Sequence, residues 1–156
     1  MTGTSPIRPA RPEDVPVIAS LIRELADYER EPDAAKASDE DLHAALFGPS
    51  PAVFCHLAEA DSEVVGLAVW FLNFSTWTGK HGIYLEDLFV RPAARGSGLG
   101  KALLLTLVDI ARERGYGRVE WSVLDWNSSA IEFYRSLGAQ PMDDWTVWRL
   151  AGTALR

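Results

Sequence analysis

The residues best placed to do chemistry lie in a glycine-rich turn, residues 91–100, between an apolar run and a helix-like segment. Gly96, Gly98 and Gly100 occupy every second position, with an arginine before them and a lysine after them. A helix N-terminus attracts anions through its unpaired N–H groups, and glycines let the backbone approach the anion closely. The turn indicates a phosphate-binding loop, although a purely structural turn explains the glycines about equally well.

The glycine spacing matches neither of the two best-known phosphate loops. A Rossmann fingerprint needs G-x-G-x-x-G, whereas this turn gives G-x-G-x-G. A Walker loop needs glycine five residues before G-K-[ST], but position 95 is Arg, and Lys101 is followed by alanine. The spacing therefore argues against a nicotinamide oxidoreductase.

The elements around this turn predict a single α/β domain over residues 1–156. Hydrophobic periodicity, helix caps and turn residues predict the ranges that follow. We expect strands near 6–10, 52–60, 63–74, 82–90, 118–124 and 145–150, and helices near 14–25, 38–47, 98–114 and 127–137. This order indicates helices packed around one mixed sheet.

Charge and composition exclude several classes of protein. The net charge of −7 argues against general nucleic-acid binding. No apolar run approaches the roughly 20 residues that a membrane span requires, and the N-terminus does not resemble a signal peptide. Cys55 is the single cysteine, so we expect a cytoplasmic protein without an internal disulfide. The three histidines have no metal-ligand spacing, and we expect no metal.

Acidic residues are concentrated between positions 24 and 41, where eight carboxylates accompany two basic side chains. A solvated helix face and loop explain this excess. A negative field that attracts a cationic ligand is the alternative explanation.

Several motifs together resemble the GNAT superfamily of N-acetyltransferases. The stretch from Arg95 to Gly100 fits R/Q-x-x-G-x-G/A, the loop that binds acetyl-CoA in that superfamily. The stretches RELADYE, TWTGKHGIYLEDLFV, WNSSAIEFYRSLGA and WRL are similar to the spermidine/spermine (diamine) and thialysine N-acetyltransferase branch. The resemblance covers about residues 6–150. It implies a GNAT-type fold, with a central, mixed but mostly antiparallel twisted sheet flanked by about four helices.

The resemblance also implies where acetyl-CoA binds. The backbone at the end of the strand predicted at 82–90 would hold the acetyl group and the pantetheine arm. The glycine turn would surround the pyrophosphate, and the start of the helix predicted at 127–137 would line the other side of the cofactor. The implied cofactor residues are Leu88, Phe89, Val90, Arg95, Gly96, Ser97, Gly98, Leu99, Gly100, Lys101, Asn127, Ser129 and Tyr134.

The same comparison implies a site for a small cationic amine. Tyr134 matches the family's general acid, which would protonate the leaving thiolate. Glu86 matches a residue that contacts the amine, and we expect it to orient the ammonium and relay its proton through water. The resemblance also gives Tyr28 and Glu29 as amine contacts, and Asp87 and Trp77 complete the expected amine-binding residues. Trp77, in a loop before Gly79, would cover the methylene chain or contact the cation, although packing in the core or at a dimer interface is the alternative for the tryptophans. Adjacent residues of a regular strand point to opposite faces, so Glu86 and Asp87 can enter one pocket only at a bulge.

The sequence leaves other functions open. An acetyltransferase that acts on protein lysine shares the same reaction, and a non-catalytic module that senses acyl-CoA shares the same cofactor loop. Glu86 has a simpler explanation as a surface carboxylate paired with Lys80 or Arg91, and Tyr134 as a core residue. The resemblance further implies a homodimer.

Overall fold

The computed structural model describes residues 5–155. They divide into two compact units, one ending at Ser122 and one beginning at Val123. The strands and α-helices of the first unit are β1 (Ile7–Pro9), α1 (Val15–Tyr28), α2 (Asp39–Phe47), β2 (Phe54–Ala60), β3 (Glu63–Ser75), β4 (Lys80–Val90), α3 (Leu99–Arg114) and β5 (Val119–Trp121). The second unit contains α4 (Ser128–Ser136) and a short 3-10 turn at Gly152–Leu155.

The first unit is built on a five-stranded sheet in the order β1-β2-β3-β4-β5. Neighbouring strands are antiparallel except β4 and β5, which are parallel. The parallel pair is joined by α3, as a crossover connection requires. The mixed, mostly antiparallel sheet and the four helices confirm the predicted fold class.

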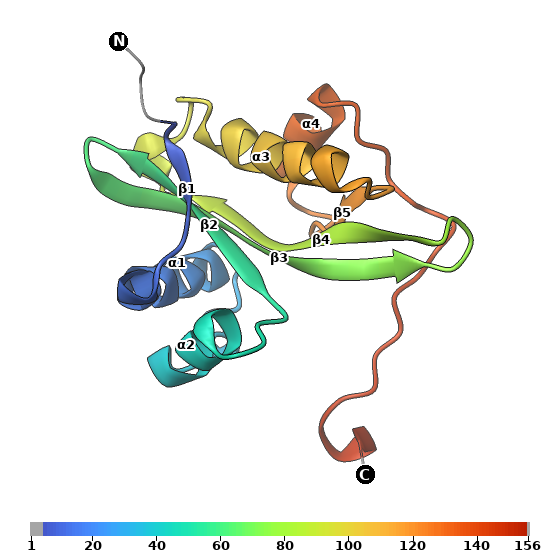
Figure 1. Cartoon of the computed structure of the whole chain (residues 1–156), viewed down its shortest axis with the longest axis horizontal. Coiled ribbons are helices and arrows are strands. Elements are labelled where there is room, and N and C mark those ends of the chain that lie inside the picture. The colour runs from blue at the N-terminus through green and yellow to red at the C-terminus, as the bar shows by residue number, and fades with distance from the viewer. Residues whose placement is uncertain (1–4, 156) are drawn as a thin grey trace. The chain divides into compact units, whose positions relative to one another are not determined.

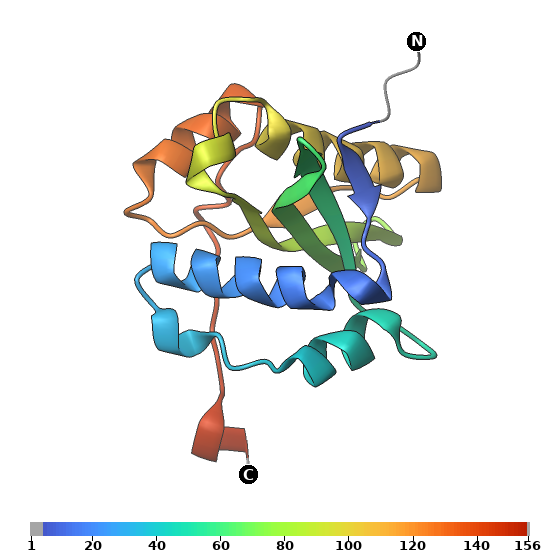
Figure 2. The ribbon, with the colours of Figure 1, turned by 90° about the vertical axis from the view of Figure 1, so that its left-hand side faces the viewer.

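Helices cover both faces of this sheet. Figures 1 and 2 show α1 and α2 on one face and α3 on the other. Between α1 and the sheet, a buried cluster joins Ile18, Leu21 and Leu25 to side chains of β2, β3 and β4. The opposite face is covered by the buried side of α3, which includes Leu103 and Leu107.

Local sequence signals place most element boundaries. Ser38 caps α2, since its Oγ accepts a hydrogen bond from the Asp41 backbone N–H at 3.0 Å. Asp61 and Ser62 both have positive φ, which is the backbone twist that a two-residue hairpin turn favours. Gly115 ends α3 and Gly138 follows α4, both in the left-handed region that glycine adopts without strain.

Two predicted strands differ from the structure. The strand predicted at 118–124 is only three residues long, because β5 pairs with β4 only from Val119 to Trp121. The strand predicted at 145–150 is wrong, because these residues form no strand in the described chain. Alternating Trp and Val raise strand propensity, but a strand exists only where a neighbour supplies hydrogen bonds.

Where β3 and β4 pair, residues 66–75 of β3 lie opposite residues 80–90 of β4, which has one residue more in this stretch. Val69 lies opposite Asp87 and Trp70 lies opposite Leu85, so Glu86 is the extra residue of a β-bulge. No helix among residues 5–155 is both long and apolar enough to cross a lipid bilayer.

Gly82 provides a test of how closely β5 approaches this hairpin. A Cβ at Gly82 would lie 2.6 Å from the Asn73 Oδ1 and 3.0 Å from the Arg118 backbone oxygen. We expect Gly82→Ala to destabilise the protein by about 1–3 kcal/mol in urea unfolding, because the strands must separate. Gly117→Ala is the control, since its Cβ would have no contact closer than 3.8 Å. Equal stability losses in the two variants would contradict this packing.

Candidate active site

The glycine turn places an uncapped helix N-terminus at the end of β4. Gly96 and Gly98 have φ of 83° and 82°, a backbone conformation that other residues adopt only with strain. A Cβ at either glycine would meet no atom within 4 Å, so conformation rather than lack of space requires glycine. Gly98 precedes α3, and no side chain caps this helix. The first N–H groups of α3 are therefore available to an anion.

Arg95 is turned toward the sheet. Its Nε donates to the Val90 carbonyl at 2.9 Å, and its guanidinium carbon lies 4.9 Å from the centre of the Tyr28 ring. The same carbon lies 5.6 Å from the centre of the Phe89 ring. Distances below about 6 Å are those of cation–π contacts. Arg95 thus links the start of the loop to the end of α1, where Tyr28 and Glu29 lie.

A second arginine fixes the loop from the other direction. Arg91 donates to both carboxylate oxygens of Glu24, with the shortest distance, 2.9 Å, from Nη2 to Oε2. It also donates to the Val64 carbonyl at 3.3 Å. Arg91 is therefore occupied by Glu24, and the alternative in which it pairs with Glu86 finds no support.

The far end of β4 has one edge without a strand neighbour. β3 pairs with β4 as far as Val90, whereas β5 pairs only with Ile83, Tyr84 and Leu85. Among the described residues, no strand therefore pairs with the backbone N–H and C=O groups that residues 86–90 direct toward the β5 side. Leu88, Phe89 and Val90, the residues expected to hold the pantetheine arm, lie along this edge.

The bulge changes which way the two acidic residues of β4 point. Asp87 lies opposite Val69, which belongs to the buried cluster between α1 and the sheet. Leu85 lies opposite Trp70, whose side chain is on the other face of the sheet. Asp87 therefore points toward α1, and Glu86, at the extra position, is exposed. A shared pocket for the two neighbouring carboxylates requires such an irregularity.

Three carboxylates gather at this point. Burial raises the pKa of Asp87 to about 6, with further contributions from the negative charges of Glu86 and Glu29. Burial also raises the pKa of Glu29, which follows the last residue of α1. No hydrogen bond or ion pair partners the Asp87 carboxylate within residues 5–155. Such a cluster favours the binding of a cation.

Trp77 lies far from the three carboxylates of the same chain. It is 88 % exposed in the β3–β4 turn, just before Gly79 with φ of 68°. Lys80 and Glu86 are six positions apart on the extended strand β4, which corresponds to roughly 20 Å. The structure does not bring Trp77 to Glu29, Glu86 and Asp87, and its contact with an amine stays a prediction.

The remaining predicted residues belong to the second unit. The Asn127 side chain caps α4, where its Oδ1 accepts from the Ala130 backbone N–H at 3.3 Å. Ser129 is exposed in the first turn of α4, and Tyr134 is half-buried with its ring centre 5.4 Å from that of Phe133. The roles of these residues toward acetyl-CoA and the leaving group stay predictions.

Neither arginine contact was predicted from the sequence. Glu24 was one of the acidic residues explained as a solvated face or a negative field, yet it binds Arg91. No local signal could have paired them, because 67 positions separate the two residues.

Asp87 should make the stability of the protein depend on pH. The unfolded chain titrates this group near 3.8 and the folded chain near 6, so the folded state binds more protons between these values. The free energy of unfolding therefore falls as pH rises through this window. We expect Asp87→Asn to be more stable than the wild type at pH 7.5 by up to about 3 kcal/mol, with the gain shrinking toward pH 4.

Urea unfolding at pH 4.5, 6 and 7.5 measures this difference. Glu63→Gln, which changes an exposed carboxylate at the start of β3, is the matched control and should show no such trend. A difference between Asp87→Asn and the wild type that stays constant with pH would contradict the assignment.

Comparison with known proteins identifies the family. The model of the acetyltransferase (GNAT) family matches residues 18–139. The chain is 38 % identical to the thialysine N-epsilon-acetyltransferase of Bos taurus, over 96 % of this chain and 94 % of that protein. It is 34 % identical to the human spermidine/spermine N(1)-acetyltransferase-like protein 1, over 92 % of this chain but 22 % of that longer protein.

A solved structure shares the fold over almost the whole chain. An integron cassette protein from the mobile metagenome of V. cholerae superposes with a TM-score of 0.81 at 29 % identity, covering 98 % of this chain and 96 % of its own. The predicted resemblance, including the diamine and thialysine branch, is confirmed. The chain belongs to the acetyltransferase (GNAT) family and is an N-acetyltransferase.

Proposed function

We propose that the protein transfers the acetyl group of acetyl-CoA to a primary amine of a small cationic acceptor, a polyamine, a diamine or a thialysine-like amine. The observation that carries the proposal is the gathering of Glu29, Glu86 and Asp87 where α1 ends against the β4 bulge. Relatives named for thialysine and for spermidine or spermine support an acceptor with more than one amino group.

The loop fits the acyl donor. Two left-handed glycines precede an uncapped helix, so backbone N–H groups are available for a pyrophosphate. Lys101, in the first turn of α3, adds a positive charge there. No strand pairs with the edge of β4 at Leu88, Phe89 and Val90, where the Val90 carbonyl accepts a hydrogen bond from Arg95. The remaining backbone groups of this edge fit the amide groups of a pantetheine arm. A thioester bound in this way supplies an activated acetyl group directly, without an acyl-enzyme.

The amine must lose a proton before it attacks, because an alkylammonium has a pKa near 10.4. Exposed Glu86 orients the ammonium and passes its proton to water. As the new C–N bond forms and the C–S bond breaks, a β4 backbone N–H near Leu88 stabilises the charge on the carbonyl oxygen. Tyr134 then donates its proton to the departing sulfur. Under this proposal the protein acts on free amines as a homodimer, as the family resemblance implies.

The acceptor can be identified by measuring thiol release from acetyl-CoA with spermidine, putrescine, thialysine, lysine and a lysine peptide. We expect turnover with the small diamines or thialysine, and rates at least about tenfold lower in Glu86→Gln and Tyr134→Phe, because each loses a proton-transfer group. Glu63→Gln and Tyr116→Phe are the matched controls and should keep the wild-type rate.

Each other outcome favours a different function. Turnover confined to the lysine peptide would replace the small amine with protein lysine as the acceptor. Tight binding of CoA without thiol release for any amine would contradict the proposed reaction and favour a non-catalytic sensor.

The loop can be tested by binding alone. Gly98→Ala and Gly79→Ala each place a Cβ on a residue with positive φ, at 82° and 68°, so both should cost about 1 kcal/mol of stability. We expect only Gly98→Ala to weaken CoA binding, by at least about tenfold in calorimetry, because its strain distorts the loop. Unchanged CoA affinity in Gly98→Ala would contradict this site.

A further inference from the structure

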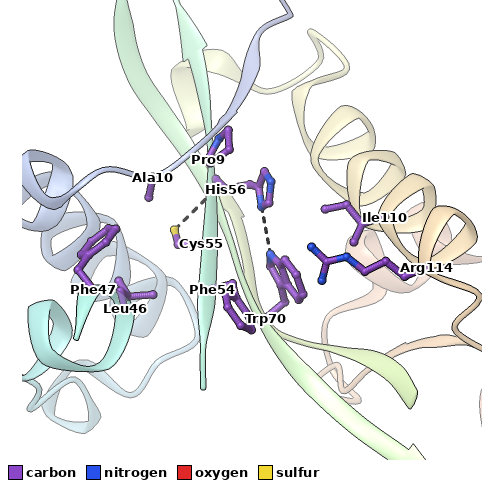
Figure 3. A pocket seen from close by; sticks show the side chains of 10 residues that line it. All are labelled: Pro9, Ala10, Leu46, Phe47, Phe54, Cys55, His56, Trp70, Ile110 and Arg114. Atoms are coloured by element: carbon purple, nitrogen blue, oxygen red, sulfur yellow. Dashed lines mark hydrogen bonds between the residues drawn. The ribbon is translucent and has the colours of Figure 1, made fainter. Parts of the chain in front are cut away.

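A pocket near the start of α1, at the end of the helix away from Glu29, has no part in the proposed reaction. Its volume is about 340 Å³, which is at the small end of the range for ligand sites. It opens where Pro9 and Ala10 precede α1, whereas Glu29 follows that helix, so a helix of roughly 20 Å separates the pocket from the carboxylates. Figure 3 shows Arg114 reaching from α3 toward Trp70, with His56 bonded to the indole.

The hydrogen bond from Trp70 determines which nitrogen of His56 carries the proton. The indole Nε1 donates to His56 Nδ1 at 3.1 Å, and an indole nitrogen can only donate. Nδ1 must therefore be unprotonated, and the neutral ring carries its hydrogen on Nε2. Burial, together with the charge of Arg114, lowers the pKa of His56 and keeps the ring neutral.

The Nε2–H of His56 is thus a half-buried donor, for which the described residues provide no acceptor. Its position in the wall of the pocket leaves it available to a bound molecule.

Arg114 supplies a positive charge at the same pocket. Its guanidinium carbon lies 6.0 Å from the centre of the Trp70 ring, and Nη1 contacts the Tyr116 hydroxyl at 3.5 Å. Within residues 5–155 it forms no ion pair with a carboxylate. No acidic side chain lines the pocket, although the chain as a whole carries a charge of −7.

The rest of the lining is apolar, with Pro9, Phe54 and Ile110 among its members. A phosphate would need more donors than this lining offers, since a buried charge is costly unless it is fully hydrogen-bonded. A carboxylate needs fewer donors, and its hydrocarbon part would bury apolar surface.

We propose that this pocket binds a small carboxylate with an aromatic or short aliphatic body. The carboxylate accepts hydrogen bonds from the His56 Nε2–H and the Arg114 guanidinium, and the apolar body packs on Phe54 and Ile110. The site is separate from the acetyl-transfer site and does not rest on the proposed function.

Calorimetry on the full-length protein tests the proposal with three probes of one shape: benzoate, benzamide and benzylamine. We expect benzoate to bind with a Kd below about 1 mM, and the neutral and cationic probes to bind at least about tenfold more weakly. Arg114→Gln should weaken benzoate binding by about tenfold, the loss expected for one charge-assisted hydrogen bond. Arg112→Gln is the matched control, because Arg112 is exposed in the same turn of α3 but lies outside the pocket.

Histidine NMR spectra locate the binding site. Benzoate should shift the His56 ring signals and leave those of His43 and His81 in place. Arg114 is exposed, so Arg114→Gln should fold normally, which circular dichroism checks. Equal binding of benzoate and benzamide, no binding at about 10 mM benzoate, an unaffected Arg114→Gln variant or an unchanged His56 signal would each overturn the proposal.

Discussion

The register shift between β3 and β4 is the constraint on which the candidate site depends. In a regular strand Leu85 and Asp87 would share a face, because side chains alternate. The extra residue at Glu86 keeps Leu85 on the face opposite α1 and turns Asp87 toward α1. One strand can thus pack against two different layers, and a carboxylate enters a poorly hydrated space beside Glu29.

Two arginines connect the glycine loop, which fits the acyl donor, to α1, whose C-terminal end fits the amine. Arg91 binds Glu24 on α1, and Arg95 contacts the rings of Tyr28 and Phe89. Both guanidinium groups have contacts inside the protein, so the proposed acyl donor would rely mainly on backbone N–H groups and Lys101. Because both arginines contact α1, the geometry of the loop and the position of Glu29 are linked.

Features that depend on a few neighbouring residues could be predicted from the sequence. The cap at Ser38, the left-handed glycine at Gly115 and the strand-to-helix turn were predicted because a few neighbouring residues specify them. The bulge and the Arg91–Glu24 pair depend on residues far apart in the chain, which no local pattern encodes. The failed strand at 145–150 has the same explanation, since propensity specifies an extended chain but not the neighbour that must pair with it.

The three carboxylates bear on which acceptor suits the proposed reaction. Negative charge near an ammonium strengthens its binding but raises its pKa, and even a free alkylammonium is neutral in only about one molecule in a thousand at pH 7.4. A single amino group held by Glu29, Glu86 and Asp87 would bind well and react slowly. An acceptor with two amino groups separates these demands. Under the proposed reaction, one cation can stay with the half-buried carboxylates of Glu29 and Asp87, while the other reaches the β4 edge and loses its proton through Glu86. The carboxylate cluster therefore favours diamines and amino acids with a terminal amine over monoamines.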